Sequence, residues 1–335
     1  MTDDRIWRYF RLTRHDPPEL AGSGSRRQVY ASSLEQAEEL FRASAAVSPS
    51  VRPLTLFYGL SQMGRAISAA TEPAQDWRLS GHGIKANNLQ GNFSDIEVWD
   101  AGAGAFTQLA RTLKSDSLTD PVRLRDIFSS LPESLEHRLP EDKFLPPLYF
   151  YLEDSGLLPR IPLRGVDMRN IVSARVYGFP EDLLDPSLAK VAAFEKFKSR
   201  YPSIYGCDIH EYVSPSDRGG MPPGAAYRIY WQIENGKTAD ETSAAIKERA
   251  PLYRADGEGR WALATLTSGV DVQPLLRWWA VLYGLSMLAR YEPNRWVALL
   301  DVNRTGYAVP LELMLDAAVR TVPSIGYRVL CDLAR

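Results

Sequence analysis

The chain has 335 residues, of which 45% are hydrophobic and 24% are charged, the composition of an ordinary globular protein. Its 39 Lys and Arg residues are balanced by 41 Asp and Glu residues, so bulk charge does not favour nucleic acid or an anionic membrane. Two cysteines, Cys207 and Cys331, exclude a disulfide framework and a cysteine-rich zinc site. The absence of a secretory leader and of about 18 consecutive apolar residues predicts a cytoplasmic protein.

The first third of the sequence predicts helices followed by a hairpin. A helix is expected over 33–46, because a serine precedes two glutamates that suit a helix amino terminus. A second helix, over 53–70, begins with proline and is apolar nearly all round, so it should be buried on most faces. A loop over 77–88 and a strand, turn and strand over 96–106 follow.

The rest of the chain mixes strands with helices and then becomes helical again. The middle predicts helices at 122–130, 132–139, 188–201 and 238–249, and strands at 148–152, 171–177, 227–233 and 260–266. The carboxyl-terminal part predicts helices at 272–291, 296–300, 310–322 and 323–333, the last two separated at a proline. We therefore expect an α+β fold, with a mainly helical body formed by both chain ends and a strand-containing central insertion. The expected parts are 1–120, 121–267 and 268–335, the last packing on the amino-terminal helices.

An internal repeat links the two most apolar predicted helices. Tyr58-Gly-Leu-Ser-Gln-Met-Gly-Arg65 matches Tyr283-Gly-Leu-Ser-Met-Leu-Ala-Arg290, with five identities at equal spacing. One interpretation is packing. Glycine inside a helix costs about 1 kcal/mol relative to alanine, and this cost is tolerated where two helices approach closely. The other is a pseudo-symmetric site in which Arg65 and Arg290 bind one anionic ligand.

Arginine recurs at every third position near the amino terminus, at Arg5, Arg8, Arg11 and Arg14, with aromatic residues between. Such interleaving suits a phosphate backbone or unstacked bases, so these arginines are candidate nucleic-acid contacts. The alternative is an amphipathic first helix with a solvated basic face.

A histidine between glycines, His82, is the candidate catalytic residue. Glycine lets backbone and ligand approach closely, and a histidine there could act as a general base or phosphate contact. Arg78 and Lys85 lie nearby and, with Arg65 and Arg290, are candidate ligand or phosphate contacts. The alternative is a turn whose histidine caps a helix. Residues 207–211 offer metal-ligand types without a partner motif, so no metal and no cofactor are expected.

Several short motifs together resemble the bacterial YaaC-like family: Leu56-Phe-Tyr-Gly-Leu60, His82-Gly83-Ile84, and Leu285-Ser-Met-Leu-Ala-Arg-Tyr-Glu-Pro293 with Trp296. The resemblance covers residues from about 28 to the end and implies a bacterial, cytoplasmic, helix-rich protein, but no reaction. A more distant similarity is to HEPN-type helical domains, whose RNases carry an Arg, a short spacer and a His on a helix. Arg78 and His82 are one residue too close and lie in a predicted loop, which puts RNase activity in doubt.

Three functions remain open from the sequence. The scarcity of catalytic motifs favours a binding or scaffold protein in a defence or nucleotide-linked pathway. The second is a nucleic-acid-binding or RNA-cleaving HEPN-like protein. The third is an enzyme acting on a small phosphorylated ligand held between Arg65, Arg290 and His82. We expect a protein partner or a homo-oligomer, nucleic acid or nucleotide as a ligand, and no membrane.

Overall fold

In a computed structural model of the chain, the described residues are 4–140, 145–152, 171–179, 195, 197–213, 225–234, 236–249, 253–254, 260–266 and 270–334. The chain divides into two compact units. The helical unit comprises Met1–Ser129, Glu136–Asp142 and Val272–Arg335, and the sheet unit comprises Ser130–Leu135 and Lys143–Asp271. Both chain ends thus belong to one unit, and the predicted α+β fold with a helical body is confirmed.

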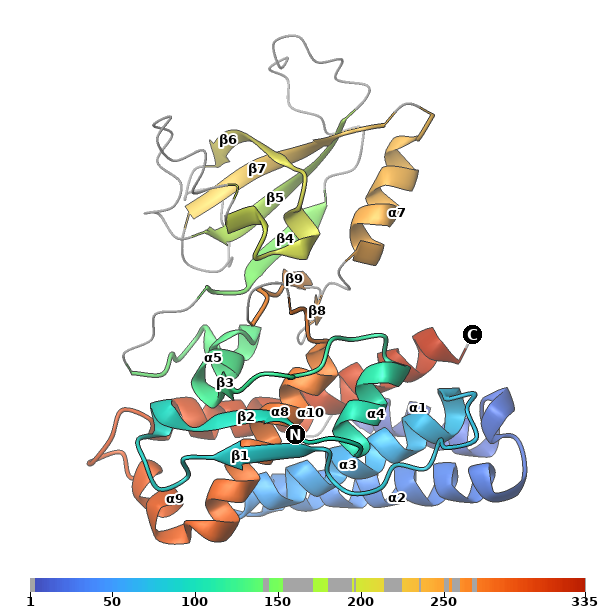
Figure 1. The fold of residues 1–335 in the computed structure, drawn as a ribbon, viewed down its shortest axis with the longest axis vertical. Coiled ribbons are helices and arrows are strands. Elements are labelled where there is room, and N and C mark those ends of the chain that lie inside the picture. The colour runs from blue at the N-terminus through green and yellow to red at the C-terminus, as the bar shows by residue number, and fades with distance from the viewer. Residues whose placement is uncertain are drawn as a thin grey trace. The chain divides into compact units, whose positions relative to one another are not determined.

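Long helices packed side by side build the helical unit, and α3 contacts α2, α8 and α10 (Figure 1). The helices are α1 (Asp4–His15), α2 (Gly24–Ala46), α3 (Arg52–Thr71), α4 (Ala105–Thr112), α5 (Leu124–Ser129), α8 (Pro274–Tyr291), α9 (Pro293–Leu299) and α10 (Ala308–Leu333), with the short turns η1 (Glu19–Ala21) and η2 (Phe93–Asp95). Burial of most residues in α3 and α8 explains why both sequences are apolar on nearly every face. Within the described residues, no helix has the length and apolar character needed to cross a bilayer.

The two repeated helices, α3 and α8, run antiparallel. The ring centroids of Phe57 in α3 and Tyr283 in α8 are 5.4 Å apart. Two turns further along α3, a Cβ on Gly64 would lie 2.6 Å from Cζ3 of Trp279, which is one turn earlier in α8. Advancing along one helix therefore means going back along the other.

The glycines that follow the repeated tyrosines lie at close helix contacts. A Cβ on Gly59 would lie 2.9 Å from Cδ2 of Phe41 in α2, and a Cβ on Gly284 would lie 2.8 Å from Cδ1 of Leu124 in α5. Each glycine makes room for a side chain from the helix that flanks its own. Packing therefore accounts for the glycine in both copies of the repeat.

A small antiparallel sheet completes the helical unit, in the order β1 (Ile84–Asn87), β2 (Glu97–Asp100) and β3 (Val122–Arg123). The predicted loop over 77–88 is therefore wrong at its end, because its last residues pair with β2. The strand predicted around Phe106 is also wrong, because Phe106 lies in helix α4. Phe106 and Leu109 are both buried, and their spacing places them on one face of this helix. Of the helix predicted over 122–130, the first two residues form β3 and the helix α5 begins at Leu124.

The sheet unit contains a six-stranded antiparallel sheet in the order β6-β7-β5-β4-β9-β8. The strands are β4 (Leu148–Leu152), β5 (Ile171–Phe179), β6 (Asp208–Val213), β7 (Ala225–Gln232), β8 (Tyr253–Arg254) and β9 (Arg260–Ala262), and the described helices are α7 (Ala239–Arg249), η3 (Pro132–Ser134) and η8 (Pro202–Ile204). Its core includes Phe150, Val176 and Ile229. The predicted helix over 132–139 shortens to η3, and most of the helix predicted over 188–201 lies outside the described residues.

Two helix boundaries differ from prediction because tertiary contacts override local signals. α2 begins at Gly24 rather than near residue 33, and its Arg26 donates from Nη1 to the carbonyl oxygens of Ala69 and Glu72 at 3.0 and 2.8 Å. Arg26 thus donates hydrogen bonds to two carbonyl groups at the end of α3, where carbonyl groups lack partners within the helix. The predicted break in the last helix is wrong as well, because α10 continues through Pro323. Its burial on both sides of the proline offsets the roughly 3 kcal/mol that proline costs in a helix interior.

Candidate functional site

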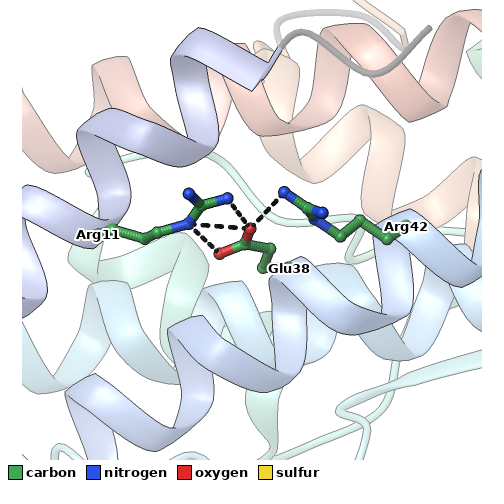
Figure 2. Close-up of polar contacts among 3 residues, drawn as sticks. All are labelled: Arg11, Glu38 and Arg42. Carbon is green, nitrogen blue, oxygen red and sulfur yellow. Dashed lines mark hydrogen bonds and ion pairs between the residues drawn. The ribbon is translucent and has the colours of Figure 1, made fainter.

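Members of the amino-terminal arginine stripe differ in what they contact. Trp7 and Phe10 are buried in the core, whereas Tyr9, the third aromatic residue of α1, is 45% exposed. Arg11 Nε lies 3.1 Å from both carboxylate oxygens of Glu38 in α2, and Arg42 Nη2 lies 3.0 Å from Glu38 Oε1 (Figure 2). Glu38 is only 7% exposed. Its two guanidinium partners therefore compensate a nearly buried carboxylate.

Arg14 is also paired, with its Nη2 atom 3.1 Å from Glu35 Oε2 in α2. Arg11 and Arg14 thus join α1 to α2 through ion pairs. Arg5 and Arg8 are exposed on the same helix. A nucleic-acid contact through this stripe stays a prediction.

His82 lies on an aromatic cluster, which we define as Phe57, Tyr58, His82 and Tyr283. The Phe57 ring centroid is 5.6 Å from that of His82 and 5.7 Å from that of Tyr58, and the rings of His82 and Tyr283 are 5.9 Å apart. Phe57 and Tyr283 are buried, whereas His82 and Tyr58 are exposed. Burial, with a smaller contribution from Tyr291, raises the pKa of Tyr283, so this phenol stays protonated at neutral pH.

The backbone around His82 is held in place by the start of α4. The His82 carbonyl oxygen accepts a hydrogen bond from Phe106 N at 3.0 Å, and the Gly83 carbonyl oxygen accepts one from Ala101 N at 3.0 Å. Gly83 has a φ of 68°, and a Cβ there would lie 2.7 Å from the carbonyl carbon of Gly104. Glycine is therefore required for this close approach. The imidazole itself has no hydrogen-bond partner in the described part of the chain, so its contacts are ring contacts.

The antiparallel packing separates the two repeated arginines. Arg65 lies eight residues after Phe57, and Arg290 lies seven residues after Tyr283. Because Phe57 and Tyr283 are at the same level and the helices run in opposite directions, the two arginines are about 20 Å apart along the helix axes. One small anion cannot bridge them.

Of the predicted cations, Arg78 lies at the same end of α3 as Arg65. Ser68, one turn after Arg65, donates from Oγ to the carbonyl oxygen of Trp77 at 2.7 Å. The exposed Arg78 follows and lies with its guanidinium carbon 4.7 Å from the Trp77 ring centroid. His82 lies beside Phe57 of the same helix.

Lys85 and Arg290 are placed elsewhere. Lys85 is exposed on β1, and strand alternation directs it away from the face that carries the buried Ile84. Arg290, at the end of α8, lies with its guanidinium carbon 5.2 Å from the ring centroid of the exposed Tyr291. Arg65, Arg78 and His82 thus lie on or beside α3 without meeting, because His82 is at the level of Phe57, about 12 Å along the helix from Arg65.

Of the metal-ligand residue types at 207–211, the structure describes the side chains of Cys207 and Asp208. Burial raises the pKa of the Cys207 thiol to about 12, so it is not a thiolate at neutral pH. Its carbonyl oxygen accepts a hydrogen bond from Lys198 Nζ at 2.6 Å. A search of the described residues finds no group of three or more His, Cys, Asp and Glu that could hold a metal ion.

A family model described as YaaC-like Protein matches residues 7–330. The chain belongs to the YaaC-like family. The match extends across both units of this YaaC-like chain, so the helical and sheet units are parts of one family architecture. No curated protein and no solved structure matches the chain. Arg78 and His82 both lie outside helices, so they do not reproduce the helical HEPN signature.

Sequence reasoning omitted the aromatic residues from the site. The His82 ring contacts Phe57 and Tyr283, and Tyr58 contacts Phe57, yet the sequence pattern indicated only His82 and nearby cations. The available signal was the tyrosine that begins each copy of the repeat. Which rings meet His82 depends on the packing of α3 against α8, which local sequence does not specify.

Proposed function

We propose that this YaaC-like chain is a binding protein without chemistry of its own, and that its helical unit binds a ligand at the exposed edge of the aromatic cluster. The packing of His82 carries the proposal. Its imidazole contacts Phe57 and Tyr283 through their rings and has no carboxylate or backbone partner within the described residues. A catalytic base is normally oriented by such a partner, whereas a ligand-stacking ring is oriented by neighbouring rings. We place this function in a defence or nucleotide-linked pathway of the bacterial cytoplasm, with a protein partner or a second copy.

The alternatives have less support in the geometry. An enzyme that holds one phosphorylated ligand between Arg65 and Arg290 is disfavoured by their separation of about 20 Å along the helix axes. Nucleic-acid binding by the amino-terminal stripe is disfavoured because Arg11 and Arg14 pair with Glu38 and Glu35 of α2.

The test separates stacking from base catalysis at His82. Thermal unfolding and product analysis are run with ATP, GTP, ribose 5-phosphate and single-stranded RNA as probes, at millimolar concentration for the small molecules. We expect at least one probe to stabilise the protein without being consumed. His82→Ala should abolish the stabilisation and His82→Phe, which keeps a ring, should retain most of it. His137→Ala changes another exposed histidine of the helical unit and should have no effect.

Two results would contradict the proposal. One is turnover of a probe that is lost in both His82→Ala and His82→Phe, because a base cannot be replaced by a phenyl ring. The other is the absence of stabilisation by every probe.

A further inference from the structure

The two equivalent tyrosines of the repeat differ in exposure, and only one of them is covered. Tyr58 and Tyr283 lie at the same level of the α3–α8 pair, because Phe57, the neighbour of Tyr58, contacts Tyr283. Tyr283 is in ring contact with His82 and is 6% exposed, whereas Tyr58 is 43% exposed. The tyrosine of the second copy, Tyr283, is thus in contact with the imidazole ring of His82, whereas the tyrosine of the first copy, Tyr58, is exposed to solvent.

Four residues, which we call the α3 face, continue from the open tyrosine along the helix. Their spacing of i, i+3, i+4 and i+7 places them on one side of α3. They are Tyr58, Ser61, Gln62 and Arg65. Tyr58 and Arg65 are exposed, and Ser61 and Gln62 are partly exposed. The polar groups of Ser61, Gln62 and Arg65 have no hydrogen-bond or ion-pair partner among the residues that the structure describes.

The neighbouring helices account for the other sides of α3 and leave this face open. Gly59 lies against Phe41 of α2, and Gly64 lies against Trp279 of α8. The face also has a clear charge preference, because α3 contains two arginines and no acidic residue between Arg52 and Thr71. The other arginine, Arg52, is paired with Asp316 of α10. Arg65 therefore remains as the cation that a ligand can use.

The order of chemical groups along the α3 face matches one class of ligand. An aromatic ring is followed by a hydroxyl and an amide, and then by a guanidinium group, over two helical turns or about 10 Å. Aromatic rings stack on nucleobases of any sequence, and guanidinium groups bind phosphate.

We propose that the α3 face binds a free nucleotide, because Arg65 is the one charged residue among its four members and matches a single phosphate group. The base stacks on Tyr58, the sugar hydroxyls bond to Ser61 and Gln62, and the phosphate pairs with Arg65. This inference rests on the proposed function, whose site it extends from His82 along α3.

The experiment uses isothermal titration calorimetry on the full chain at about 50 mM salt, a condition that favours phosphate contacts. The probes are AMP, ATP, adenosine, ribose 5-phosphate and a short single-stranded RNA. Tyr58→Leu removes the stacking ring and Arg65→Gln removes the charge. Tyr291→Leu is the matched control for an exposed tyrosine, and Arg290→Gln changes the arginine at the same position of the other repeat.

We expect a crossed pattern of losses. Tyr58→Leu should weaken AMP and adenosine about tenfold and leave ribose 5-phosphate unchanged. Arg65→Gln should weaken AMP and ribose 5-phosphate about tenfold and leave adenosine unchanged. Both controls should bind as the wild type does. AMP or ATP should bind at least as tightly as RNA, whereas tighter binding of RNA with a steeper salt dependence would overturn the free nucleotide in favour of a single strand.

Failure of this inference can be told from failure of the proposed function. If both α3-face variants bind AMP and RNA as the wild type does while His82→Ala loses binding, the nucleoside phosphate assignment is overturned and the His82 site stands. Equal losses in the variants and their controls would also overturn the assignment. Absence of binding by every probe would overturn both. Circular dichroism checks that each variant is folded, as expected for exposed side chains.

Discussion

Gly64 is the position where the addition of one methyl group tests the packing of the repeated helices. The equivalent residue in the second copy is Ala289, and alanine gains roughly 1 kcal/mol of helix propensity over glycine. At Gly64, however, a Cβ would lie 2.6 Å from Cζ3 and 3.0 Å from Cη2 of Trp279, whose rigid indole is fully buried. Overpacking of this kind costs about 1–3 kcal/mol, and the short contact favours the upper half of that range. We therefore expect Gly64→Ala to lower the free energy of unfolding by about 1–2 kcal/mol.

Urea unfolding followed by far-ultraviolet circular dichroism measures this change, and a double-mutant cycle assigns its cause. Trp279→Phe removes the part of the ring that meets the new methyl group, so the double variant should be about 1 kcal/mol more stable than the sum of the single changes predicts. Gly91→Ala is the control, because the nearest atom to its Cβ is Asn88 O at 3.5 Å. A Gly64→Ala variant that is more stable than the wild type, or an additive cycle, would refute the packing described for α3 and α8.

Three further predictions concern other parts of the chain. Glu38→Gln should lower the free energy of unfolding, measured in urea, by about 1–2 kcal/mol. This value is modest because the side chains of Arg11 and Arg42 are nearly half exposed. An unchanged free energy of unfolding would mean that these ion pairs do not stabilise the protein. Burial raises the pKa of Tyr30 from 10.0 to about 12, so stability should fall between these pH values, where the unfolded chain ionises first; Tyr30→Phe should reduce that fall. Cys207 should resist alkylation at pH 8 in the native protein and react after unfolding, and rapid native labelling would contradict its burial.

Much of the helical unit was predictable because its signals are local. A proline at the first turn and an apolar surface on nearly every side are enough to locate α3 and α8 to within a few residues. Predictions failed where distant contacts decide. Arg26 extends α2 into a predicted loop by bonding to the end of α3, and α10 passes through Pro323 because it is buried on both sides. At β1 the sequence predicts a loop, because the strand that pairs with it lies ten or more residues away.

For the site, the sequence by itself determined which residues to consider: the repeat, the histidine between glycines and the surrounding arginines. Only the tertiary structure decided which of them meet. The antiparallel direction of α3 and α8 brings Phe57 and Tyr283 to His82 and sends Arg65 and Arg290 to opposite ends. Helix periodicity specifies which residues share a face of one helix, but not how two helices are oriented toward each other. Arg65 thus shares a face with Tyr58, two turns earlier in its own helix, and not with its counterpart in the repeat.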